Sequence, residues 1–149
     1  MKLTGSVRLE LKDEAGKVIE ERFAPNVVVI VGKNYLAQWL TANSQSGKFM
    51  SYVGLGTSTT PALNTDTILG SELPVGPNYS RQSGTLTATT NIWTNVTFFP
   101  VLNGTGVINE IGLFSTVSGG TMFAHQVFSA GITKAPNNTL TVTWQISFT

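Results

Sequence analysis

The sequence predicts an all-β protein, an antiparallel β-sandwich of jelly-roll type with one short α-helix. Turn-forming residues separate about eight or nine strand-like stretches at short spacing. Charged residues make up 11% of the chain, against about 25% in ordinary soluble domains. Thr, Ser, Asn and Gly take their place, and this mix favours strands and turns. Because we find no internal repeat and no interdomain linker, we expect residues 1–149 to form a single domain.

A charged β-hairpin is expected at residues 1–24. Leu3–Leu11 alternates apolar and polar side chains, Asp13–Gly16 supplies a turn, and Lys17–Phe23 returns as a second strand. Ten of the seventeen charged residues lie within the first 22 positions. This hairpin is therefore expected to be solvated, as an edge of the sheet or a projecting arm that ends at Pro25-Asn26.

One helix is expected after a central strand. Val27–Val31 is a continuous β-branched run, which suits a buried strand, and Gly32 interrupts it. The apolar side chains of the following segment, Asn34–Thr41, fall on one helical face. They are Tyr35, Leu36, Trp39 and Leu40, and we expect them to pack on the sheet.

A long loop follows the next strand. Phe49–Gly56 reads as a strand after a polar loop at Ala42–Lys48, and Thr57–Ser80 is rich in Pro and Gly. We expect this segment to be an irregular loop with a short helical turn near Asp66–Leu73. Loops of this length are often functional, here through contact with a partner.

The second half of the chain is predicted to be entirely β. Gln82–Thr90 and Asn91–Leu102 form an antiparallel pair in which Pro100 marks an edge or a bulge. Gly106–Phe128 is a hairpin around the turn Ser118-Gly119-Gly120. In the final strand, Leu140–Phe148, apolar side chains alternate with a Thr-rich face.

The first strand of the Gly106–Phe128 hairpin is apolar on both faces. Val107, Ile111 and Leu113 are expected on one face, and Ile108 and Phe114 on the other, so the strand needs cover on each side. Asn109 and Glu110 interrupt these apolar residues. A carboxylate in such surroundings needs donors, so we expect Glu110 to accept hydrogen bonds from backbone N–H groups or an Arg.

The sequence offers no catalytic, cofactor-binding or metal-binding residues, and we expect that the protein is not an enzyme. His125 is the single histidine and is expected to be structural. Counting alone leaves a Ser-His-Asp arrangement with Asp13 or Asp66 open, but no nucleophile elbow is present. Cysteine is absent, and the acids after residue 22 are only Asp66, Glu72 and Glu110.

The two tryptophans of the second half could form a platform for a sugar. Trp93 and Trp144 are more often core residues in such strands, and we favour the core position. A carbohydrate-binding module nevertheless stays open as an alternative function.

Charge and hydropathy favour neither a nucleic-acid nor a membrane partner. The net charge is +1 without a basic run. The longest apolar run, Val27–Val31, is too short to cross a bilayer, and the N-terminus lacks the apolar core of a signal peptide. We therefore expect the chain to be made and folded in a cytoplasm.

Three stretches in this order resemble small virion structural proteins of tailed bacteriophages. They are YVGLGTSTTP (Tyr52–Pro61) followed by DTILGSEL (Asp66–Leu73), then VINEIGLFSTVSGGTMFAHQVF (Val107–Phe128), then ITKAPNNTLTVTWQISF (Ile132–Phe148). The resemblance covers roughly residues 27–149 and implies a β-sandwich. The charged hairpin lies outside it.

The resemblance implies a non-enzymatic role in a virion. Members serve as capsid decoration or cement proteins, and related sequences occur among tail, baseplate and fibre components. The implied partner is the major capsid protein or another virion protein. Because cement proteins often sit where three capsomers meet, a homotrimer is expected.

Overall fold

The computed structural model describes residues 2–41, 50–74 and 81–149, with side chains from 37 to 41 left out. The single helix of this described part is α1 (Ile30–Thr41). The strands are β1 (Leu3–Lys12), β2 (Val18–Val28), β3 (Tyr52–Gly56), β4 (Glu72–Leu73), β5 (Arg81–Thr89), β6 (Ile92–Phe99), β7 (Gly106–Phe114), β8 (Met122–Lys134) and β9 (Thr139–Phe148). The predicted polar loop at 42–48, Phe49 and residues 75–80 lie outside the described residues, as do the side chains of Trp39 and Leu40.

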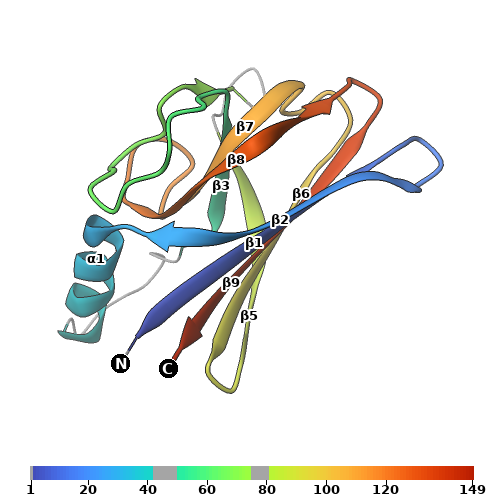
Figure 1. Cartoon of the computed structure of the whole chain (residues 1–149). Helices are drawn as coiled ribbons and strands as arrows, with labels where there is room; N and C mark the ends of the chain where they lie inside the picture. Colours follow the sequence, from blue (N-terminus) through green and yellow to red (C-terminus); the bar gives the residue numbers. More distant parts are fainter. Residues whose placement is uncertain (1, 42–49, 75–80) are drawn as a thin grey trace.

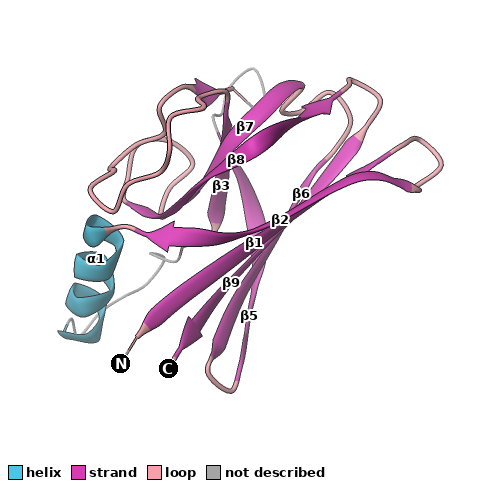
Figure 2. Cartoon of the chain, viewed as in Figure 1, coloured by secondary structure: helices cyan, strands magenta, loops and turns pink. Residues whose placement is uncertain are grey.

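The strands close into an eight-stranded antiparallel barrel. Neighbouring strands follow the order β3-β5-β6-β9-β1-β2-β8-β7, and β7 pairs with β3 to complete the circle (Figure 1, Figure 2). The short strand β4 continues the β3 edge beside β5. The all-β, antiparallel class is thus confirmed, but the predicted jelly-roll sandwich is wrong. Alternating strands of a sandwich and of a barrel look alike in sequence, and the pairing of β3 with β7 is what distinguishes them.

The barrel is filled by side chains rather than hollow. Buried residues alternate with more exposed ones along β1, β6 and β9, and in β9 they do so as predicted. The largest fully buried apolar side chains include Trp144, Phe99, Leu9 and Ile111. Small barrels of eight strands have just enough interior to be packed in this way.

The N-terminal hairpin is a structural part of the barrel wall. β1 lies between β9 and β2, and Val7, Leu9 and Leu11 belong to the core. Only the turn end of the β1–β2 hairpin extends past the other strands (Figure 1). The prediction that this hairpin ends at Pro25-Asn26 is wrong. β2 continues beyond these residues and, from Val27 on, pairs with β8 instead of β1.

The run Val27–Val31 is divided between a strand and a helix, contrary to the prediction of one central strand. β2 ends at Val28 and α1 begins at Ile30, four residues earlier than expected. Gly32 lies inside the helix instead of interrupting the chain. A Cβ atom at this position would lie 2.6 Å from Phe123 Cα, so the missing side chain lets α1 pack backbone against backbone on β8.

A β-bulge changes the predicted faces of β7. The register of the β7–β8 pair shifts between Ile108 and Glu110. Ile108 therefore joins Ile111 and Leu113 in the barrel core, whereas Val107 is exposed. A bulge adds one residue on one strand and thereby reverses the alternation beyond it.

The loop after β3 covers the outer face of the barrel. Residues 57–71 cross over β7 and β8, and Leu69 packs with Phe114, Met122 and Val29 in a second, smaller apolar cluster. The strand β7 therefore has cover on both faces, as its sequence predicts. The helical turn expected near Asp66–Leu73 does not form, since this segment ends in the extended strand β4.

Candidate functional site

A buried polar cluster joins the loop 57–71 to the outer face of the barrel. At its centre is Glu110 of β7, whose side chain is fully buried. Its Oε1 accepts hydrogen bonds from the backbone N–H groups of Ser58 (3.2 Å) and Ser71 (2.7 Å), and its Oε2 accepts one from Gly70 (3.0 Å). Buried backbone N–H groups need an acceptor, and this one carboxylate serves three of them, at both ends of the loop.

His125 connects Glu110 to a second carboxylate. Its Nε2 lies 2.9 Å from Glu110 Oε2, and its Nδ1 lies 2.8 Å from Asp66 Oδ2. Asp66 Oδ2 also accepts the backbone N–H of Leu63 at 2.8 Å. Both ring nitrogens of His125 thus face carboxylate oxygens, and the imidazole joins the two acids into one hydrogen-bonded group. We call the group Asp66, Glu110 and His125 the latch.

Three glycines on the same outer face make room for the latch and the loop. Glycines occupy positions 54, 56 and 112, where side chains would point outward. A Cβ at Gly56 would lie 2.6 Å from Glu110 Cγ, and a Cβ at Gly112 would lie 2.7 Å from Phe114 Cε2. The glycines of VGLG and EIGLF are therefore required by the close approach of the covering layer.

A second ion pair holds the far end of the loop. The buried Arg81 of β5 makes two hydrogen bonds to Glu72, from Nε to Oε1 at 2.7 Å and from Nη2 to Oε2 at 3.0 Å. Its guanidinium lies 3.3 Å above the centre of the Phe114 ring and also donates to the carbonyls of Thr116 and Gly119. The β7–β8 turn and β4 are thus fixed to the same side of the barrel.

The loop held in this way presents two large apolar side chains to solvent. Leu63 is 58% exposed and Ile68 is 70% exposed. Ile30 at the start of α1 is also exposed, and its N–H donates to Asn64 O beside Leu63. The one charged side chain of residues 57–71, Asp66, turns inward to His125.

The polar atoms of the latch are largely engaged by one another and by the loop backbone. Both nitrogens of His125 and both oxygens of Glu110 are engaged, and no hydroxyl donates to the ring among the described residues. The same residues contain no cluster of His, Cys, Asp or Glu arranged to bind a metal ion. No described helix is both long enough and apolar enough to span a membrane.

The sequence-based expectations for the single residues have mixed outcomes. Glu110 accepts backbone N–H groups, which confirms its predicted structural role, and its further partner is His125 instead of an Arg. The contact of His125 with Asp66 is one that counting had left open as part of a Ser-His-Asp arrangement, but the second ring nitrogen faces Glu110 and not a serine. Asp13 lies far from both, in the β1–β2 turn, where it accepts bonds from Ala15 and Lys17.

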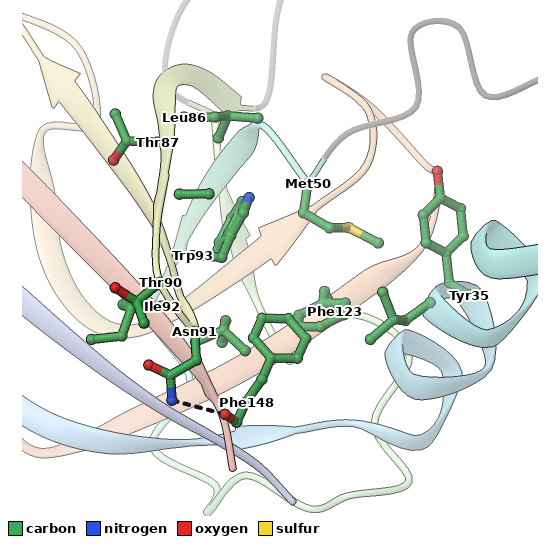
Figure 3. A pocket seen from close by; sticks show the side chains of 13 residues that line it. Tyr35, Met50, Leu86, Thr87, Thr90, Asn91, Ile92, Trp93, Phe123 and Phe148 are labelled. Atoms are coloured by element: carbon green, nitrogen blue, oxygen red, sulfur yellow. Dashed lines mark hydrogen bonds between the residues drawn. The ribbon is translucent and has the colours of Figure 1, made fainter. Parts of the chain in front are cut away.

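The two candidate tryptophans have different surroundings. Trp144 is fully buried in the barrel core, as favoured. Trp93 is half-buried and lines an apolar cavity at the mouth of the barrel (Figure 3). A flat platform built from both rings is therefore excluded.

The latch and the loop above it draw on residues from three sequence stretches. The first stretch, Tyr52–Pro61, contains Gly54, Gly56 and Ser58. The second, Asp66–Leu73, contains Asp66, Leu69 and the backbone donors Gly70 and Ser71. The third, Val107–Phe128, contains Glu110 and His125. Comparison with protein-family models, curated proteins and solved structures found no match. The resemblance thus depends on these motifs alone.

Proposed function

We propose that the chain is a non-enzymatic structural protein of a tailed-phage virion that attaches to a protein lattice through the loop 57–71. The observation that carries this proposal is a loop that is held by buried hydrogen bonds and has an uncharged outer surface with two large exposed apolar side chains. Buried acceptors fix its backbone, yet Leu63 and Ile68 face solvent. Apolar side chains on a preorganised segment are what anchors a protein–protein interface, because little entropy is lost on binding.

Within this class, attachment to the capsid as a decoration or cement protein is the primary proposal. The resemblance of the three sequence stretches supports it, and so does the low charge of the chain after residue 22, since interface cores are poor in charged residues. The partner is then the major capsid protein, and a homotrimer would match a site where three capsomers meet. Attachment to a tail, baseplate or fibre is the second candidate.

Two further classes receive less support from the geometry. An enzyme would need a group free to move a proton, and the latch residues are all engaged by one another or by backbone donors. A carbohydrate-binding module would use exposed aromatic rings with polar neighbours, whereas Trp144 is buried and Trp93 lies among apolar side chains. A glycan array with the purified protein tests the latter class directly, and a hit that requires Trp93 would favour it.

The test of the proposed attachment compares two surface variants. The double variant Leu63→Asp, Ile68→Asp should lose about tenfold or more in binding to particles assembled without this chain, because it places charge in an apolar contact. The control is Leu102→Asp, which changes a leucine that is 73% exposed in the β6–β7 turn. Both variants should melt like the wild type, since exposed side chains contribute little to stability.

The readout also separates the candidate locations. Binding is measured by cosedimentation with purified heads and, separately, with purified tails, and light scattering gives the mass of the free protein. Binding to heads supports the decoration role, and binding to tails alone supports the second candidate. A protein that binds neither, or a loop variant that binds as tightly as the wild type, would contradict the proposal.

A further inference from the structure

A cavity of about 560 Å³ opens at the mouth of the barrel, away from the latch. One wall is the β5–β6 hairpin with Leu86, Ala88 and Trp93, and the facing wall is α1 with Tyr35 and the adjoining Phe123 of β8 (Figure 3). Ile146 and Phe148 at the end of β9 lie between these walls. The mouths of eight-stranded barrels are a common place for small-molecule sites, and pockets of roughly 300–1,000 Å³ are typical of them.

The walls of this cavity are held by regular structure. Trp93 pairs with Ile146 on one side and with Ala88 on the other, so the three side chains share one inward-facing layer. α1 is fixed on β8 by the backbone contact at Gly32, one turn before Tyr35 and Leu36. The next inward-facing layer of the same strands contains the fully buried Trp144 and Asn95.

The lining defines the chemistry of what fits. Among the described residues, no Asp, Glu, Lys, Arg or His lines the cavity, and the polar side chains there are those of Tyr35, Thr87, Thr90 and Asn91. The amide of Asn91 already donates to Phe148 O at 2.9 Å (Figure 3). An ionic group or a sugar would lose its water without gaining partners here, whereas aromatic and aliphatic carbon would gain contact with four aromatic rings.

We propose that the mouth of the barrel binds a neutral, largely apolar small molecule, such as a hydrocarbon chain or a fused aromatic ring system. Large apolar concave surfaces on soluble proteins generally serve binding, because water gains little by filling them. This site lies on the inner side of the β5–β6 hairpin and does not involve Leu63 or Ile68. The proposal is therefore independent of the proposed attachment to a lattice.

The test uses a neutral fluorescent probe, N-phenyl-1-naphthylamine, titrated into the full chain. We expect saturable binding of one probe per chain with an increase in emission. Ala88→Phe places a ring in the cavity and should weaken binding by about tenfold or more, since the probe loses most of its apolar contact. Thr85→Phe is the matched control, because Thr85 is exposed on the outer face of the same strand and should leave binding unchanged.

The remaining outcomes decide against the proposal. Absence of saturable binding to the wild type would overturn it, and so would equal affinity in Ala88→Phe and in the control. Probe binding that occurs only as an oligomer dissociates would show that a second copy fills the cavity instead. If Ala88→Phe lowers the melting temperature, Leu86→Trp repeats the test at the neighbouring inward position of β5.

Discussion

Removing the Glu110 carboxylate should release the loop 57–71 from the barrel. In Glu110→Ala, the backbone N–H groups of Ser58, Gly70 and Ser71 lose their acceptor in a buried layer, and His125 Nε2 loses its partner. Each unpaired buried donor costs about 1–3 kcal/mol, and breaking a buried charged pair costs about 3–5 kcal/mol. Such sums are not additive, because the loop can detach and let water reach the donors.

The loss in the free energy of unfolding is limited, because the loop detaches once its contacts with the barrel become unfavourable. We expect Glu110→Ala to lower the free energy of unfolding by about 3–5 kcal/mol. For a domain of this length the melting temperature then falls by roughly 6–20 °C. Glu110→Gln retains an acceptor for Ser58 and Ser71 but turns an amide towards Gly70 N–H, so a smaller loss of about 1–3 kcal/mol is expected.

Two measurements test this reasoning. Calorimetry gives the order wild type, Gln variant, Ala variant, and amide hydrogen exchange should show loss of protection at Gly70 and Ser71 before the barrel strands. Glu14→Gln, in the exposed β1–β2 turn, is the control and should melt within a degree or two of the wild type. Wild-type melting and wild-type amide protection in Glu110→Ala would refute the structural role of this carboxylate.

Three further changes test other parts of the same structure. Gly56→Ala should destabilise the chain by about 2–4 kcal/mol in denaturant unfolding, because its Cβ would lie 2.7 Å from Ser71 O; wild-type stability would show that the layer can shift. Asp66→Asn should cost about 1–2 kcal/mol and weaken protection of the Leu63 amide in hydrogen exchange, with an unchanged amide as the contrary result. Burial lowers the pKa of Lys134 below its usual 10.5, so the folded state binds fewer protons than the unfolded state as the pH approaches 10.5. The free energy of unfolding of the wild type, relative to that of Lys134→Met, should therefore rise with pH just below 10.5. A difference that stays constant with pH would contradict this.

Most strands were predictable from the sequence because each leaves a local pattern, but β4 was expected in a helical turn and Val29–Val31 in a strand. β9 begins one residue from its predicted start and ends where expected, and the inward set Leu140, Val142, Trp144 and Ile146 follows directly from alternation. The barrel was not predictable in this way. Closure depends on Tyr52–Gly56 meeting Gly112 and its neighbours, a pairing between segments more than fifty positions apart that no local period encodes.

The polar cluster was only half predictable for a similar reason. Burial of Glu110 followed from its apolar neighbours, and the demand for donors followed from its charge. Its donors, however, come from an irregular loop, and no local pattern predicts that this loop lies over the glycine-lined outer face. The sequence signal that could have indicated these donors is that Gly54, Gly56 and Gly112 all fall on the outward-facing side of their strands. Glycines placed in this way mark a surface that another part of the chain approaches closely.

The latch also explains why this layer is polar when an apolar layer would pack more simply. A loop without regular structure brings backbone N–H groups into a buried layer, and apolar side chains cannot accept their hydrogen bonds. A carboxylate offers enough lone pairs for Ser58, Gly70 and Ser71 together, and His125 extends the network to Asp66. Leu69 contributes apolar burial but does not specify one loop path, whereas the directional bonds to Glu110 do. The exposed positions of Leu63 and Ile68 are then a consequence of bonds made beneath them, which is why a change at Glu110 should affect any partner that contacts the loop.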